Sequence, residues 1–490
     1  MSVEENVLSL APPAPPAEEG MNARALIRML IVVSGMLMVG LDFFGVNVAV
    51  PSIHADLHAS NAAIEFVVSV FNLAYSAGMV TAGRLGDLYG RRRAFALGMV
   101  LFTLASLAAG LAPTAGVLIA ARVVQGVGAA VMTPQMLAII NTAFSGPQRI
   151  RAFTAFALAM GISATFGQLI GGTMIRLDIA GLGWRSIFLV SVPIGTASLL
   201  LMRRFIPESR GSGRQGLDVL GALLGALGLL ALVVPLIEGR EQGWPGWTWA
   251  ALATSVPLLV LFALRQSRLE RTGRAPLISP CLFRERAFSV GVSIILGFFA
   301  AMASFMLVFA LYLQEGQGLT PLGSGLVFAG LGIGYVPAAF VAPRIAAHMG
   351  RQVLTLGALV VSLGYALMVV AVHAVGISGH APWVMPGLAV AGAGMALFAN
   401  PVTPTVLAGV SPHHAAAAAG VLSTAQEGGN SLGVAAIGVV FFGVLGDAPV
   451  HSLAYAHAFE WSAAVLALFT LAVAIAVQLL PEPQPAPAVT

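Results

Sequence analysis

Long apolar runs recur fourteen times along this chain, at 25–49, 63–83, 94–112, 115–139, 152–175, 185–205, 217–237, 247–265, 287–312, 322–343, 352–374, 384–408, 415–444 and 456–480. A helix needs about 20 mostly apolar residues to cross the hydrocarbon core of a bilayer, and each run is close to that length. Only 9% of the residues are charged, whereas a soluble domain needs roughly a quarter to cover its surface. The sequence therefore predicts an all-α integral membrane protein with 14 transmembrane helices.

The arginines predict how these helices are oriented. If the N-terminus lies in the cytoplasm, 20 of the 24 arginines fall in cytoplasmic segments, while Arg176, Arg185 and Arg240 fall outside and Arg122 lies within the fourth helix. Such a bias is the positive-inside pattern. We therefore expect a multi-pass protein of the plasma (cytoplasmic) membrane with both termini in the cytoplasm.

The remaining composition excludes several classes of protein. The net charge of +4 is carried by arginines beside the ends of apolar runs, which favours the lipid bilayer as partner and not nucleic acid. The single cysteine, Cys281, excludes an internal disulfide framework and a CxxC metal site. No zinc ligand set, phosphate-binding loop or nucleophile elbow occurs, so we expect no metal, no cofactor and no enzyme. Nothing in the sequence demands an oligomer, so we expect a monomer.

Two segments repeat at an interval of about 260 residues. GRLGDLYGRRR at 83–93 aligns with PRIAAHMGRQ at 343–352, and GQLIG at 167–171 aligns approximately with GNSLG at 429–433. Parallel repeats about an axis along the membrane normal are a transporter architecture. We therefore predict a cytoplasmic tail at 1–24, a six-helix bundle at 25–205, two inserted helices at 217–265, a second six-helix bundle at 287–480 and a short tail at 481–490.

Four segments carry a family resemblance. Residues 83–93 resemble the G-x-L-x-D-x-x-G-R-R/K loop motif of the major facilitator superfamily. LDFFGVNVAVPSI at 41–53, RVVQGVGAA at 122–130 and WRSIFLVSVPIG at 184–195 resemble signatures of its fourteen-helix drug:proton antiporter family, of multidrug efflux type. The resemblance implies a major facilitator fold, with two six-helix bundles plus two inserted helices, and transport driven by the proton gradient.

The antiporter motif of the fifth helix departs from the family pattern. Gly167, Gly171 and Gly172 are present and permit close contact between helices, but Gln168 stands where the family has proline. No proline kink is therefore expected there. In the loop motif, formed by Gly83, Arg84, Asp87, Gly90 and Arg91, the resemblance implies a latch that holds one conformation and releases it during the transport cycle.

Asp42, Arg122 and Glu427 lie well inside predicted membrane spans, where an ionisable side chain is by default a functional candidate. Asp42 and Arg122 each lie about seven residues, roughly 10 Å, from the outer end of a predicted helix, so they could share one cavity. Gln125 follows Arg122 on the same helix face. We predict that Asp42 couples protonation to transport, with a static ion pair as the alternative; Glu427 could carry a second proton or bind a cation.

The favoured function is therefore export of small amphipathic or cationic drugs or toxic metabolites by drug:proton antiport. Phe43, Phe44 and Phe71 are candidates for the walls of the substrate cavity, together with Gln125. An importer or exporter of one specific metabolite remains an alternative, because the fifth helix lacks the family's proline. A polytopic membrane enzyme or a receptor is a further alternative from a different class.

Overall fold

The computed structural model describes residues 22–210, 218–274, 276–376, 381–410 and 415–481 of the chain. Most of the tails predicted at 1–24 and 481–490 lies outside these ranges. The long helices are α1 (Ala23–Leu57), α2 (Asn61–Tyr89), α3 (Arg91–Gly110), α4 (Ala115–Ala143), α5 (Gly146–Leu177), α7 (Ser191–Phe205), α8 (Val219–Glu241), α9 (Gly246–Arg271), α10 (Arg286–Leu311), α11 (Pro321–Met349), α12 (Gln352–Val375), α13 (Met385–Ala408), α14 (Ala415–Leu445) and α15 (Leu453–Val477).

Several of these helices begin where the sequence supplies a side-chain cap. The side-chain oxygen of Asn22 accepts from the backbone of Ala25 at 2.8 Å, and Ser60 and Thr320 act in the same way at the starts of α2 and α11. Capping satisfies backbone N–H groups that have no partner within the helix. In the bilayer core the rest of the backbone is satisfied within each helix, which is why the apolar runs fold as helices.

The predicted number of membrane spans is confirmed. Thirteen helices in the described chain are long and apolar enough to cross a bilayer, and the bent helix α5 makes a fourteenth if its two segments form one span. The short helix α6 (Ser186–Leu189) continues into α7, and the two share one of these spans.

Helix α5 is bent although it lacks the family's proline. Its segments Gly146–Ser163 and Phe166–Leu177 meet at 58°. The bend lies before Gln168 and involves no proline, so the expectation that this helix has no proline kink is not contradicted. Gly161 and Ser163 lie directly before the bend, and such Gly/Ser pairs are sites of sharp kinks in helices without proline.

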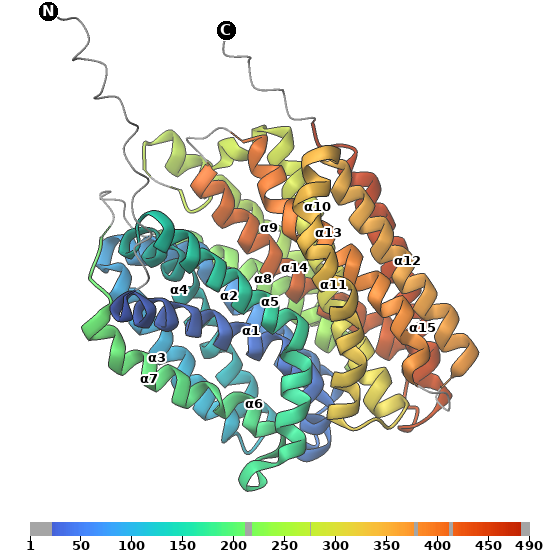
Figure 1. Cartoon of the computed structure of the whole chain (residues 1–490). Coiled ribbons are helices and arrows are strands. Elements are labelled where there is room, and N and C mark those ends of the chain that lie inside the picture. Colours follow the sequence, from blue (N-terminus) through green and yellow to red (C-terminus); the bar gives the residue numbers. More distant parts are fainter. Residues whose placement is uncertain (1–21, 211–217, 275, 377–380, 411–414, 482–490) are drawn as a thin grey trace, which may run out of the picture.

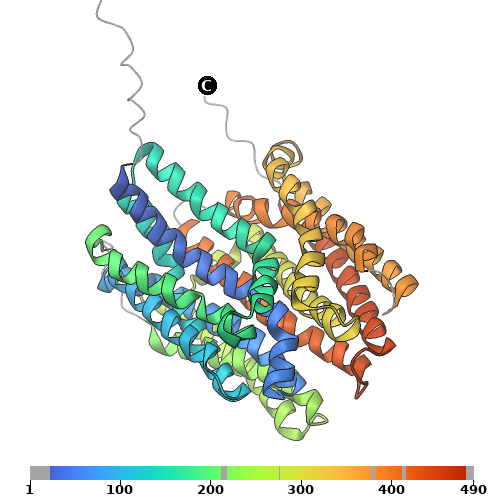
Figure 2. The same ribbon diagram turned by 60° about the horizontal axis from the view of Figure 1, so that its bottom comes forward.

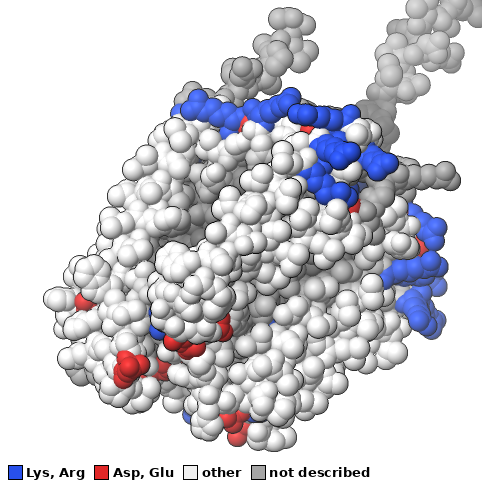
Figure 3. Space-filling model, turned by 180° about the vertical axis from the view of Figure 1, so that it is seen from behind, with Lys and Arg blue, Asp and Glu red and all other residues white. Residues whose placement is uncertain are grey.

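Two groups of helices lie side by side, the N-terminal bundle (α1–α7) and the C-terminal bundle (α10–α15), and Figures 1 and 2 show them in blue to green and in yellow to red. The inserted hairpin α8–α9 packs through α8 against both α2 and α14. Arginines gather at one end of the molecule and acidic side chains toward the other (Figure 3). We call the end that carries Arg91, Arg92 and Arg93 the arginine-rich end and the other the opposite end.

The two bundles use glycine in the same places. Gly167 and Gly171 of α5 leave room for α1, because a Cβ atom on either would lie within 3.2 Å of α1 atoms. Gly429 and Gly433 of α14 stand in the same relation to α10, at 2.4 Å and 2.1 Å. Small residues let membrane helices approach closely without a hydrophobic driving force between them. The pairs α1–α5 and α10–α14 thus pack through corresponding glycines.

The turn motif also recurs in space. Gly90 ends α2 with φ +108° and Gly350 ends α11 with φ +56°, both in the region that glycine alone adopts without strain. Each turn leads directly into the next helix of its bundle, α3 or α12.

The seam between the bundles is formed by α5 against α11 and by α2 against α14. Gln314, directly after α10, donates to the carbonyl of Val48 in α1 at 3.0 Å, and Ser431 of α14 donates to the carbonyl of Ser69 in α2 at 3.1 Å. These contacts lie toward the opposite end, where α1 finishes and α2 and α11 begin. The bundles are therefore joined at that end.

Candidate transport site

Asp42 and Arg122, two charged residues within the membrane-spanning region, are in direct contact. Asp42 comes from α1 and Arg122 from α4, and Nη1 of the arginine donates to Oδ2 of the aspartate. Their side chains are 0% and 1% exposed. α1 continues to Leu57, beyond the predicted limit of 49, so the equal depths inferred from the helix ends do not hold in detail. The structure nevertheless joins the two residues that the sequence selected.

Gln125 completes the surroundings of this pair. Its amide oxygen accepts from Arg122 Nη1 at 2.8 Å, and its amide nitrogen donates to Asp42 Oδ1 at 2.8 Å and to Ser106 Oγ at 3.0 Å. Arg122 Nε donates to the carbonyl of Val67 at 2.9 Å. A buried ion pair is tolerated only when further hydrogen bonds satisfy both charges, and this network meets that condition.

The aromatic candidates surround the network without forming one open cavity. The Arg122 guanidinium carbon lies 4.3 Å from the centre of the Phe71 ring and 5.7 Å from that of Phe188, within the range of cation–π attraction. Phe44 packs against Gly167 of α5. The rings of Phe43 and Phe44 meet edge to face, with 4.8 Å between their centres. Phe71 is fully buried, so in this conformation it supports Arg122 and offers no surface to a substrate.

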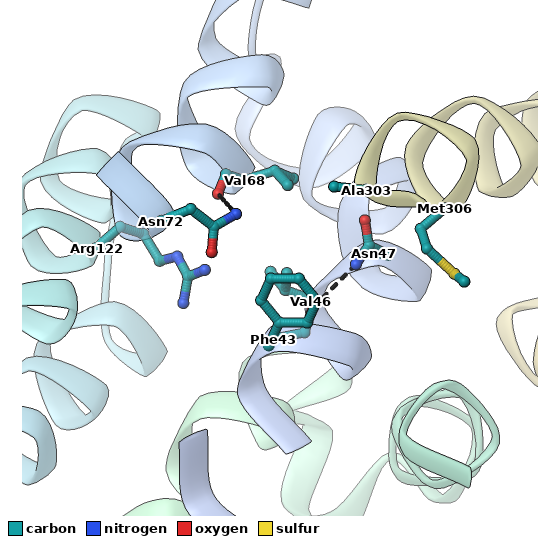
Figure 4. Close-up of a pocket in the computed structure, with 8 residues that line it drawn as sticks. All are labelled: Phe43, Val46, Asn47, Val68, Asn72, Arg122, Ala303 and Met306. Carbon is teal, nitrogen blue, oxygen red and sulfur yellow. Dashed lines mark hydrogen bonds between the residues drawn. The ribbon is translucent and has the colours of Figure 1, made fainter. Parts of the chain in front are cut away.

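A small cavity lies beside Arg122, at the meeting of the two bundles (Figure 4). It has a volume of about 10 Å³, which is room for about one water molecule. Its walls are Phe43, Val46, Asn47, Val68, Asn72 and Arg122 from the N-terminal bundle with Ala303 and Met306 from α10. Polar atoms of Asn47, Asn72 and Arg122 therefore face residues of the other bundle across a nearly closed space.

Glu427 lies in α14, on the other bundle. It is partly exposed, and its Oε2 accepts from the amide of Asn430 on the same helix at 3.1 Å. It lies 12 residues from the start of α14, about 18 Å along the helix axis. This position is close to the middle of α14.

The loop motif lies at the arginine-rich end. Asp87 contacts Arg91, four residues later, at 3.0 Å, and Arg84 donates to the carbonyl of Pro276 in the segment after α9. Gly83 lies deeper in α2, facing α4 at Pro134. The contact described for Asp87 thus lies within the N-terminal bundle. That this loop motif holds one conformation and releases it during the transport cycle stays a prediction.

Sequence reasoning missed Glu208, the acidic residue that organises this loop. Its carboxylate accepts from the backbone of Arg92 at 3.0 Å and lies 3.6 Å and 3.7 Å from the side chains of Arg92 and Arg93. A Cβ atom on Gly90 would come within 2.6 Å of it, which explains the glycine. The available signal was an isolated acid within an arginine-rich segment between two predicted spans.

A second, larger cavity was also missed. It has a volume of about 440 Å³, lies between α2, α4 and α8, and is lined almost wholly by apolar side chains such as Val127 and Leu223. Sites for drug-sized ligands usually occupy about 300–1,000 Å³. No periodicity in one helix could have revealed it, because its third wall belongs to the inserted hairpin.

Comparison with known proteins identifies the family. The family model described as Major Facilitator Superfamily matches residues 32–434 and 294–490. The chain belongs to the major facilitator superfamily. The resemblance stated from the sequence motifs is therefore confirmed, and members of this superfamily are transporters and in general not enzymes.

Among curated relatives in the superfamily, the chain is 35% identical over 427 residues to the probable actinorhodin transporter of Streptomyces coelicolor, covering 87% of this chain and 74% of the relative. It is 33% identical over 441 residues to the puromycin resistance protein pur8 of Streptomyces alboniger, covering 89% and 86%. The first relative is named for the transport of actinorhodin and the second for resistance to puromycin. The chain is thus a multi-pass membrane transporter of the multidrug type.

Solved structures support the same fold. A bacterial homologue of the human lysosomal transporter Spinster superposes with a TM-score of 0.68 at 15% identity, covering 96% of this chain and all of the other. An auto-inhibited peptide transporter of the POT family superposes with a TM-score of 0.67 at 15% identity, covering 94% and 99%. The predicted major facilitator fold is confirmed.

Proposed function

We propose that this chain is a proton-coupled exporter of small amphipathic or cationic molecules, which moves them by alternating access between its two bundles. The observation that carries this proposal is the buried Asp42–Arg122–Gln125 network beside the meeting point of the bundles. The antibiotic-related names of the relatives support export of a drug or toxic metabolite as the direction and class of transport.

The chemistry of the network supports proton coupling. As a carboxylate, Asp42 accepts from Arg122 and Gln125. A proton taken up on Oδ2 would remove the negative charge and free an arginine donor. Arg122 would then need another acceptor, because an unpaired buried charge is costly. Protonation of Asp42 is in this way converted into movement of α4 relative to α1.

The proposed location is the plasma membrane, with the arginine-rich end and both termini in the cytoplasm. The positive-inside bias of the sequence supports this orientation. In this proposed orientation the end at which the bundles are joined lies on the outer side of the membrane, which is the arrangement of an inward-facing transporter. The proposed partners are the lipid bilayer, protons and a small-molecule substrate; the protein would act as a monomer without nucleic acid, metal or cofactor, with the proton gradient as its energy source.

The test is the accumulation of a fluorescent cation, and of a panel of antibiotics, in a bacterial strain stripped of its own efflux pumps. Expression of the chain should lower accumulation, and an uncoupler should reverse the effect. Cells that express Asp42→Asn should accumulate as much of the compounds as cells treated with the uncoupler. Cells that express Asp447→Asn, which changes an exposed aspartate after α14, should accumulate as little as cells with the wild type. Unchanged accumulation across the panel, or increased uptake of a metabolite, would contradict the proposal.

A further inference from the structure

Glu65 is an acidic residue buried in the seam between the bundles. It lies one turn into α2, near the opposite end, and is 1% exposed. Neither of its carboxylate oxygens has a hydrogen-bond partner among the described residues. An unsatisfied buried carboxylate is strongly unfavourable unless a counter-charge is near.

The C-terminal bundle closes over this carboxylate through a glycine. A Cβ atom on Gly438 of α14 would lie 2.1 Å from Glu65 Oε2, so only glycine admits the carboxylate at this position. Because α2 and α14 belong to different bundles, Glu65 can be sealed in this way only while the bundles are joined at the opposite end. Separation of the two helices there would expose the carboxylate to water.

The counter-charge comes from the inserted hairpin. Nη2 of Arg240, near the end of α8, lies 4.0 Å from Glu65 Oε1, and the guanidinium carbon lies 4.9 Å from the centre of the Phe442 ring of α14. The 4.0 Å between the Arg240 nitrogen and the Glu65 oxygen is too long for a hydrogen bond. The Arg240 side chain is 17% exposed, and its Nε and Nη2 atoms have no hydrogen-bond partner in the part of the chain that the structure describes. The Arg240 guanidinium of α8 thus attracts the Glu65 carboxylate of α2 without a hydrogen bond, and it also contacts Phe442 of α14.

The same hairpin is fixed to both bundles at this point. The side chain of Glu241 accepts from the backbone of Ala62, in the first turn of α2, at 3.0 Å. Val233 and Ile237 of α8 form one buried apolar cluster with Ala62 of α2 and Ala435 of α14. Arg240 is therefore held beside the seam while the two bundles are closed at this end.

We propose that Glu65 and Arg240 form a charge latch for the opposite end, in which the inserted helix α8 supplies the counter-charge that allows α2 and α14 to close. This inference rests on the proposed alternating access and gives the inserted hairpin a part in it. Arg240 acts through Glu65 and is a positioning residue. The latch forms when the bundles close over Glu65, and it opens when water solvates the carboxylate in the outward-open state.

The experiment measures how often the seam opens. A cysteine replaces Ala435, the buried α14 residue of the shared cluster, in a protein whose own Cys281 is serine. A membrane-impermeant maleimide is added from the outer face at pH 8, and the rate of labelling is recorded. Arg240→Gln should raise that rate at least about tenfold, equivalent to about 1.4 kcal/mol, because it leaves a buried charge unpaired. The double variant Glu65→Gln/Arg240→Gln should return toward the wild-type rate.

Two further variants control the result. Arg185→Gln breaks an ion pair with Asp56 that lies wholly within the N-terminal bundle, so it should leave labelling unchanged. Arg240→Lys keeps the charge and should stay within about threefold of the wild type, since a threefold change is under about 1 kcal/mol. If Arg240→Gln does not fold, Glu65→Gln alone should slow labelling, because it removes the buried charge from the closed state.

The inference would be overturned by wild-type labelling of Arg240→Gln, by a double variant no closer to wild type than the single one, or by faster labelling of Glu65→Gln. These measurements need no substrate. Failure of the proposed function would appear instead as a wild-type chain that changes the accumulation of no compound while its seam still opens and closes.

Discussion

His54 and Glu315 join the two bundles at the opposite end of the molecule. Nδ1 of His54, in the last turn of α1, lies 2.8 Å from Oε1 of Glu315, in the π-helical turn that follows α10. The other carboxylate oxygen of Glu315 accepts from the hydroxyl of Tyr455 in α15 at 2.9 Å. This contact lies at the same end of the molecule as Glu65, so polar contacts close that end at more than one place.

Removal of this contact should loosen the closed end. We expect His54→Gln to destabilise the closed state by about 0.5–1 kcal/mol, the contribution of a partly exposed ion pair. The population in which this end is open should therefore rise about two- to fivefold. The measurement is maleimide labelling of a cysteine at Val46, which lies below the contact in the wall of the small cavity. His373→Gln is the matched control, because His373 pairs with Glu460 at 3.6 Å within the C-terminal bundle. Equal acceleration by both variants would contradict the prediction.

Arginine should be required at position 122 and lysine should not replace it. Lysine keeps the positive charge but cannot contact Asp42, Gln125 and the Val67 carbonyl at once, nor stack on Phe71 as guanidinium does. We expect Arg122→Lys to reach the membrane in normal amount and to lower the maximal export rate at least about tenfold, equivalent to about 1.4 kcal/mol. Initial rates of efflux from preloaded cells at several substrate concentrations give this value.

The control for that prediction is Arg185→Lys, at a partly exposed arginine that pairs with Asp56. Its export should stay within about twofold of the wild type, since exposed ion pairs contribute little. Normal export by Arg122→Lys would show that charge alone suffices and that the geometry of the network is unimportant.

Much of the fold followed from local sequence rules. Apolar length set the number of spans, and the repeat of 83–93 at 343–352 corresponds to two equivalent turns, in which Gly90 and Gly350 have positive φ angles. The cost of burying charge also selected Asp42 and Arg122, which the structure places in contact. Span length and turns are properties of one helix at a time. Asp42 and Arg122 stood out because a charged side chain is unfavourable in a membrane span unless it has a partner.

Contacts between distant helices were not predictable in the same way. Glu65 is the third residue of the span predicted at 63–83, and its burial depends on Gly438, which lies 373 positions later in another bundle. Glu315 lies just beyond the apolar run predicted at 287–312, in a π-helical turn that no periodicity revealed. In both cases the neighbours that decide the role of the acid are set by the packing of bundles.

Gly172 should be intolerant of a methyl group, because it lies where α5 meets α11 of the other bundle. A Cβ atom there would lie 2.4 Å from the Pro321 carbonyl oxygen. We expect Gly172→Ala to destabilise the closed state by about 1–3 kcal/mol, the usual cost of overpacking. The apparent Tm in detergent should fall, and labelling at Val46→Cys should accelerate. Gly116→Ala is the control, since nothing lies within 4 Å of its Cβ position, and its Tm should not fall.

Asp218 should make the inserted hairpin sensitive to acid. This residue caps α8: its carboxylate accepts from the backbone of Gly221 at 2.9 Å, from Gln266 at 2.8 Å and from Arg265 at 2.7 Å. Burial alone would raise the pKa of Asp218, but these hydrogen bonds and the charge of Arg265 outweigh it and hold the pKa below the ordinary value of 3.8. Because the folded pKa is the lower one, the contribution to stability is present above pH 3.8 and is lost as the pH falls through the folded value.

The comparison of wild type with Asp218→Asn tests this sign. Asparagine can still cap α8 but cannot pair with Arg265, so the variant should have the lower apparent Tm at pH 7. Thermal unfolding in detergent, repeated between pH 7 and pH 3, should show a difference that is constant down to about pH 4 and narrows below it. Asp447→Asn, at an exposed aspartate, should show no such difference at any pH. A gap between wild type and Asp218→Asn that widens on acidification would mean that the carboxylate destabilises the hairpin, and the assignment of Asp218 as its charged cap would be wrong.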